Sequence, residues 1–190
     1  MIRPDSLTGW AATTAIAATM LPAQLVVAST YLSTEAAQRL LFPGADRFEP
    51  LPIAPSAGQL AAIASAAGPQ APHGRLLAWT ARHGDSVLGH VFVDEVVGRE
   101  DFITYAVGID AGGKLLPVEI LEYRESHGGE IRNTRWLAQF AGRTSTSALR
   151  FRADIKNIAG ATLSSEHVTA GVRRVLALWQ TVIHPASSAG

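Results

Sequence analysis

Apolar residues recur at intervals of three and four near the end of the chain, and charged or polar residues occupy the other helical faces. The apolar positions are Val168, Val172, Val175, Leu176, Trp179 and Ile183. This period predicts a long C-terminal helix over residues 165–183 that buries one stripe of side chains. Ser164 or Ser165 is the expected N-cap, so we expect Thr162 to lie just before the first turn of this helix.

Four stretches in the middle of the chain favour β-strands, because β-branched and aromatic residues alternate there between short turns. These stretches are residues 75–82, 87–97, 102–109 and 114–124. The tight turns at 83–86 and 110–113 suit antiparallel neighbours, since parallel pairing needs long crossovers. Together with a short helix at 134–140, they predict an α+β fold: an antiparallel β meander packed with helices, followed by the long C-terminal helix.

The first residues have a different pattern from the rest of the chain. Residues 10–28 carry no charge and end in Val26-Val27-Ala28. This pattern predicts a signal peptide over residues 1–28, cleaved after Ala28. An uncleaved anchor stays open as an alternative, because the uncharged run is close to the roughly 20 residues that cross a bilayer. Either reading places the remaining chain outside the cytoplasm, in the periplasm or an equivalent compartment.

Residues 29–72 are expected to form N-terminal helices and a linker. Ser33 or Thr34 can cap a short helix that Pro43-Gly44 ends. Five prolines between residues 48 and 72 interrupt any pattern apart from an Ala-rich helix near 57–67. We therefore expect the main domain to span residues 73–184, followed by a disordered tail at 185–190.

Composition narrows the classes of function. With 190 residues, 47% of them hydrophobic, the chain can build one domain with a proper core. Sixteen basic residues balance sixteen acidic ones, so we expect no nucleic-acid partner. The chain has no cysteine, and its six histidines lack the spacing of a ligand set, so we expect neither thiol chemistry nor a metal site. Redox chemistry would need a bound cofactor.

One motif precedes the predicted C-terminal helix. The run Asp154-Ile155-Lys156-Asn157-Ile158-Ala159-Gly160-Ala161-Thr162-Leu163-Ser164-Ser165 suits either a plain turn and cap or an anion site at a helix N-terminus. Its second half, from Ala159 to Ser165, resembles the flavinylation motif of the FMN-binding domain family. That family includes the flavoprotein subunits of the Na+-translocating quinone reductase and Rnf-type complexes, and the nitrous-oxide regulator proteins. The resemblance implies that a flavin transferase, with FAD as donor, attaches FMN through its phosphate to Thr162.

A second stretch extends the resemblance upstream. Glu125-Ser126-His127-Gly128-Gly129 is similar to the family's flavin-contacting loop, and Trp136 with residues 140–143 to the segment that follows it. The whole resemblance covers residues 89–179. It implies a cofactor site without a catalytic residue of the protein's own. The implied FMN-binding residues are Thr162, Ala159, Gly160, Ala161, Leu163, Ser164, Glu125, Ser126, His127, Gly128 and Gly129. From the residues alone, His127 could equally be a loop residue that faces solvent.

The resemblance implies an extracytoplasmic FMN-binding protein with covalent FMN that relays electrons in a membrane-associated redox chain. Its partners would be the flavin transferase and a membrane redox protein, and it would be an electron-transfer flavoprotein more than a stand-alone enzyme. Lys156 stands where the family usually has an acid. A secreted accessory or sensory module on the same fold without covalent flavin therefore stays open, as does a flavin-dependent small-molecule reductase.

Overall fold

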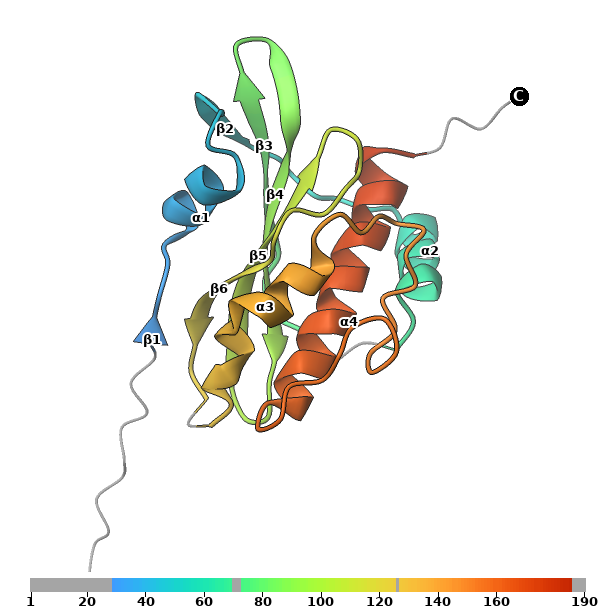
Figure 1. The fold of residues 1–190 in the computed structure, drawn as a ribbon. Coiled ribbons are helices and arrows are strands. Elements are labelled where there is room, and N and C mark those ends of the chain that lie inside the picture. The colour runs from blue at the N-terminus through green and yellow to red at the C-terminus, as the bar shows by residue number, and fades with distance from the viewer. Residues whose placement is uncertain (1–28, 70–72, 126, 186–190) are drawn as a thin grey trace, which may run out of the picture.

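The computed structural model describes residues 29–69, 73–125 and 127–185. A six-stranded sheet in the order β1-β6-β5-β4-β3-β2 forms its centre, and every neighbouring pair is antiparallel (Figure 1). The strands are β1 (Ser29–Thr30), β2 (Arg47–Pro50), β3 (Leu77–His83), β4 (Ser86–Val97), β5 (Phe102–Asp110) and β6 (Glu119–Tyr123). Because β3 to β6 are neighbours in chain order, the predicted antiparallel meander and the α+β class are confirmed.

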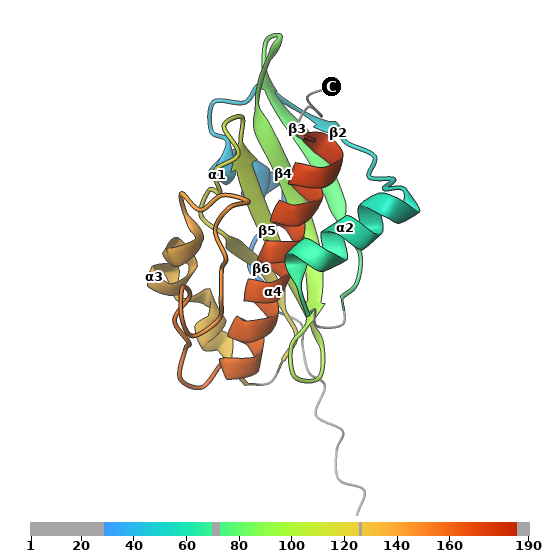
Figure 2. The same ribbon diagram turned by 90° about the vertical axis from the view of Figure 1, so that its right-hand side faces the viewer.

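Helices cover both faces of the sheet (Figures 1 and 2). Helix α1 (Thr34–Leu41) packs on one face, where Leu41 joins a cluster with Val91 and Leu121. The opposite face carries α3 (Thr134–Leu137) and α4 (Thr162–Leu178), and α4 continues as one π-helical turn, η3 (Trp179–Ile183). Helix α2 (Ala57–Ala67) lies beside α4 in both views. The main core therefore lies between the sheet and α4.

The stripe of α4 packs as its period predicts, and Trp179 is buried at its end. Gly171 lies where α4 approaches the sheet most closely, because a Cβ there would overlap the Tyr105 hydroxyl. That hydroxyl donates to Asp94, and Arg174 of α4 forms an ion pair with the same carboxylate. A buried polar group thus lies between α4 and the sheet.

The predicted start of the C-terminal helix is wrong by three residues. Helix α4 begins at Thr162, and its N-cap is Ala161, which provides no side-chain hydrogen bond. Ser165 does not cap the helix, because its hydroxyl donates back to the carbonyl oxygen of Thr162 at 2.9 Å. Thr162 is therefore the first residue of the helix and does not precede it.

Three strands, β6, β2 and the two-residue β1, also differ from the prediction. Pro117 has no N–H to donate, so the ladder to β5 is interrupted and β6 begins only at Glu119. Strand β2 was not predicted, because it is short and ends at Pro50, which an edge strand tolerates. Strands β1 and β2, both from the predicted linker region, form the two edges of the sheet.

Some predictions lie outside the described residues. These are the signal peptide or anchor at 1–28, residues 186–190 of the tail, and Ser126. Within the part of the chain that the structure describes, no helix has the length and apolar character to cross a membrane.

Candidate functional site

The two motifs meet in space. Gly128, in the loop after β6, has a backbone φ of +91°, and a Cβ built on it would lie 3.6 Å from both the Ala161 Cβ and the Gly160 carbonyl oxygen. The loop and the flavinylation-like motif, about thirty residues apart in sequence, are thus in contact. Between them is a surface hollow of about 240 Å³. It is lined by Arg99, His127, Gly128, Gly160, Ala161, Thr162, Leu163 and Ser164.

Seven of the predicted site residues therefore line one hollow. Ala159, Gly129 and Glu125 are not among its lining residues, and Ser126 lies outside the described residues. Ala159 faces the neighbouring hollow with Trp136. Gly129, the first residue of η1 (Gly129–Arg132), is exposed, and a Cβ on it would meet no atom within 4 Å. The Glu125 carboxylate accepts hydrogen bonds from the backbone of the turn that joins β4 to β5.

Thr162 stands at the edge of the hollow with its hydroxyl already in a hydrogen bond. The side-chain amide of Asn157 donates to the Thr162 Oγ1 at 3.2 Å. Gly160, with φ of +88°, turns the backbone into the first turn of α4. Thr162 as a whole is half-buried and lines the hollow.

The first turn of α4 presents unused donors. Ala161 has no side chain that can cap the helix, and the backbone N–H groups of Thr162, Leu163 and Ser164 have no acceptor among the described residues. Free N–H groups and the helix dipole both favour a negative charge at such an end. An anion attached at Thr162 would meet these donors.

The turn between β4 and β5 is fixed beside this helix end. One oxygen of the Glu125 carboxylate accepts the backbone N–H groups of Arg99, Glu100 and Asp101, at 2.7 Å for Glu100 and 3.0 Å for Asp101. On the other side of the turn, His167 of α4 donates from Nδ1 to the carbonyl oxygen of Val97 at 2.6 Å. His167 therefore has a structural role as a hydrogen-bond donor.

This turn contributes a residue that the sequence analysis missed. Arg99 lines the hollow together with Thr162, and its side chain is 70% exposed. Its ion pair with Glu100, at 3.6 Å, is equally exposed and therefore weak. A cation thus lies beside the uncapped end of α4. No sequence motif marks Arg99, because only the fold brings the turn to the hollow.

Tyr123 joins the loop to α4 and was also missed. Its buried hydroxyl donates to the carbonyl oxygen of His127 and lies 3.4 Å from the Ser164 Oγ. Burial raises the pKa of this phenol, so it remains a donor at neutral pH. Because the loop is bound through the backbone of His127, the exposed ring of this residue stays available at the hollow.

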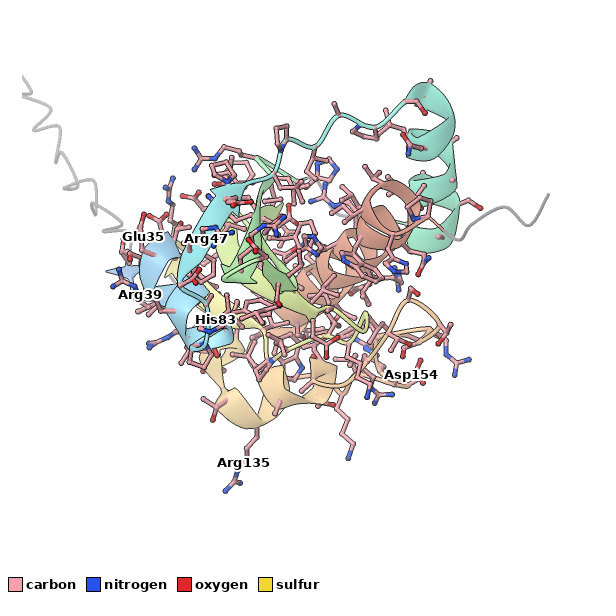
Figure 3. The ribbon with its side chains drawn as sticks, turned by 90° about the horizontal axis from the view of Figure 1, so that it is seen from above. Glu35, Arg39, Arg47, His83, Arg135 and Asp154 are labelled. Atoms are coloured by element: carbon pink, nitrogen blue, oxygen red, sulfur yellow. The ribbon has the colours of Figure 1, made fainter. Side chains whose placement is uncertain are left out.

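A second hollow lies on the other side of the motif. It measures about 580 Å³, is wide open, and is lined by residues that include Trp136, Lys156 and Ala159. The Trp136 Nε1 donates to the Lys156 carbonyl oxygen at 2.6 Å. This hydrogen bond fixes the backbone just before the motif. Arg135, on α3 beside this hollow, points away from the body of the protein (Figure 3). The side chains of Lys156 and Arg135 thus present positive charge next to the motif.

Asp154 does not replace the acid that the family usually has. Its carboxylate is bound by Arg150, from Nε at 3.1 Å and from the backbone N–H at 2.9 Å. These hydrogen bonds hold the pKa of Asp154 below its usual range. Figure 3 shows Asp154 on the loop before α4, well apart from Arg135. Within residues 29–69, 73–125 and 127–185, no three acidic or histidine side chains gather to hold a metal ion.

Comparison with known families agrees with this geometry. The family model described as the FMN-binding domain matches residues 98–177. The match begins at the β4–β5 turn, includes the loop after β6, and ends in α4, so it contains every segment that lines the hollow. No curated protein matches the chain. The segment from residue 98 to residue 177 is therefore a domain of the FMN-binding family, as the two motifs indicated, and FMN is its cofactor.

Proposed function

We propose that the protein carries FMN covalently on Thr162 and relays electrons outside the cytoplasm. The observation that carries the proposal is the position of Thr162 as the first residue of α4, at the edge of the hollow that both motifs line. A flavin transferase with FAD as donor forms the bond, and a membrane redox protein exchanges electrons with the attached flavin. FMN supplies the electron chemistry, and the protein supplies position and electrostatics.

The attachment step balances without a further reactant. The Thr162 Oγ1 attacks the phosphorus on the riboflavin side of the FAD pyrophosphate, and the bond from that phosphorus to the bridging oxygen breaks. AMP leaves, and the threonine proton passes to a base or to the leaving phosphate. The product is a phosphodiester that carries one negative charge.

The surroundings of Thr162 suit that charge. The N–H groups of Leu163 and Ser164 belong to the uncapped first turn of α4, and Arg99 brings a positive charge to the lining of the same hollow. The ring system would extend past the loop at His127 and Gly128. Leu163, 46% exposed, offers an apolar surface next to the attachment point.

The shape of the hollow favours electron relay over reduction of a small molecule. Its volume of about 240 Å³ is below the roughly 300 Å³ at which pockets usually begin to enclose a drug-sized ligand. A flavin held there would keep much of its ring exposed to a partner protein. The same hollow leaves no enclosed space for a substrate beside the ring.

The pattern of residues 10–28 supports a place of action outside the cytoplasm. Residues 10–28 are free of charge and end in a pattern typical of signal-peptide cleavage. Export would bring the domain to a compartment in which a membrane redox protein can reach the flavin. An uncleaved anchor would give the same location and a fixed distance to the membrane.

A matched pair of variants tests the attachment. Co-expression with a flavin transferase should make the tryptic peptide 157–173 heavier by FMN less water, with fragment ions that place the addition on Thr162. Thr162→Val removes the nucleophile and keeps the shape, so it should abolish the addition. Thr162→Ser keeps a hydroxyl and should retain it. Modification at Ser164 or Ser165 would show that another hydroxyl is the acceptor. An unmodified wild-type peptide would refute covalent attachment and favour an accessory module. Lys156, in place of the acid that the family usually has, would then explain the lack of modification.

A further inference from the structure

Three polar side chains form a small network around the acceptor hydroxyl. The Asn157 Nδ2 donates to the Thr162 Oγ1 at 3.2 Å, and the Ser165 Oγ donates to the Asn157 Oδ1 at 3.1 Å. Asn157 lies in the exposed loop before α4, whereas Ser165 is fully buried in the first turn of the helix. The network therefore connects the surface hydroxyl to a fixed point inside the protein.

The oxygen end of the Asn157 amide faces Ser165. The single proton of the Ser165 hydroxyl is shared between the Asn157 Oδ1 at 3.1 Å and the Thr162 carbonyl oxygen at 2.9 Å. Because this hydroxyl donates to the Asn157 Oδ1, the amide nitrogen is the atom that faces Thr162. The Thr162 Oγ1 consequently accepts a hydrogen bond and keeps its own proton free.

We propose that Asn157 is a positioning residue for flavinylation, which rests on the proposed role of Thr162 as the acceptor. The hydrogen bond from Asn157 holds the Thr162 side chain in one rotamer and directs its O–H bond away from the protein. The proton then points to a base outside the chain, and a lone pair points to the incoming phosphorus. Positioning of this kind raises the rate of a reaction between two bound groups.

Asn157 itself exchanges no atom in this step. The Oγ1–phosphorus bond forms, the bond from that phosphorus to the AMP oxygen breaks, and the threonine proton leaves with the base or with AMP. Asn157 keeps both amide protons and still donates to the ester oxygen in the product. Removal of its N–H should therefore slow the transfer without weakening recognition of the chain by the transferase.

Initial rates of FMN incorporation test the proposal. The full chain at varied concentration, a flavin transferase and excess FAD give kcat and KM for the acceptor, with incorporation followed by intact mass. Asn157→Asp keeps the shape of the side chain and replaces the N–H donor by an acceptor. Asn157→Leu removes both the amide donor and the amide acceptor. In each variant kcat should fall about tenfold, the factor expected from one lost positioning hydrogen bond. KM should stay within about twofold, because the substitution leaves the binding of the chain to the transferase unchanged. Asn157→Gln keeps an amide donor and should recover part of the rate.

A second measurement does not depend on transfer. Coupling constants of the Thr162 side chain in the flavin-free protein should show one χ1 rotamer in the wild type and averaging in Asn157→Leu. A kcat within twofold of wild type in Asn157→Asp, or an averaged rotamer in the wild type, would overturn the role of Asn157 while Thr162 remains the acceptor. Wild-type protein that takes up no FMN at Thr162 would overturn the proposed function and the role of Asn157 with it.

Discussion

Gly128 should be far more sensitive to substitution than its neighbour Gly129, although both belong to the same flavin-contacting loop. Gly128 has a φ of +91°, and a Cβ on it would lie 2.5 Å from the Tyr123 hydroxyl oxygen. Around Gly129 no heavy atom lies within 4 Å of the corresponding position. The substitution Gly128→Ala therefore meets two obstacles that Gly129→Ala does not.

The magnitude follows from these two obstacles. A left-handed backbone costs an L-residue about 1–2 kcal/mol. The new methyl group must also push the Tyr123 hydroxyl away from the His127 carbonyl oxygen, which loses a hydrogen bond of about 1 kcal/mol. Gly128→Ala should thus lower the free energy of unfolding by about 2–3 kcal/mol. Gly129→Ala should change it by less than about 0.5 kcal/mol.

Denaturant unfolding of the two alanine variants beside the wild type measures this difference. The flavin-loaded proteins add a second reading, because displacement of the loop at Gly128 should shift the flavin absorption and potential, whereas the exposed change at Gly129 should not. Equal destabilisation by the two variants would refute the contact between the loop and Tyr123. An unchanged flavin spectrum in a folded Gly128→Ala protein would remove the loop from the cofactor site.

Two further predictions concern the core. Arg174→Met leaves the fully buried Asp94 carboxylate without its cation, so the free energy of unfolding should fall by about 3–5 kcal/mol, and adding Asp94→Asn should recover most of it. Failure to recover in denaturant unfolding would contradict the pairing. Burial, with Arg82 and His184 nearby, lowers the pKa of His90 below 6.5, and its neutral ring accepts the Trp179 indole N–H at 3.2 Å. The unfolded chain then binds the extra proton, so this stability is complete above pH 6.5 and is lost as the pH falls. Melting temperatures from about pH 8 to about pH 5 should decline less in His90→Gln than in the wild type, and equal declines would contradict this account.

The periodicity of apolar residues predicted the elements that bury one face in the core. It failed where local hydrogen bonds determine at which residue an element begins. The strands β3 to β5 and the body of α4 agree with the predicted bounds to within a few residues, because each must place apolar side chains in one core. The start of α4 was missed, because Ser165 resembles a cap in sequence but its hydroxyl bonds to the Thr162 carbonyl oxygen and to Asn157. No side-chain signal marks Ala161 as the N-cap.

The site was predictable only in part for a related reason. The resemblance identified the two segments that touch, since each carries its own motif. Arg99 and Asn157 carry no motif and become neighbours of Thr162 through the fold alone. Glu125 was expected against the flavin, but its carboxylate accepts three backbone N–H groups from the β4–β5 turn.

This position of Glu125 gives it an indirect part in the site. Three separate segments line the hollow: the β4–β5 turn, the loop after β6, and the start of α4. Glu125 connects the loop to the turn, and His167 connects the turn to α4. Tyr123 connects the loop to α4 through His127 and Ser164. Each segment is therefore held by the other two.

A closed set of contacts of this kind fixes the geometry of the hollow through the protein's own residues. Ordering of loops upon binding costs free energy, and a site that is already ordered avoids that cost. The Thr162 hydroxyl, the uncapped N–H groups and Arg99 are consequently held around one hollow. In the attachment that we propose, the transferase would therefore meet a folded acceptor and not a loop that it has to order.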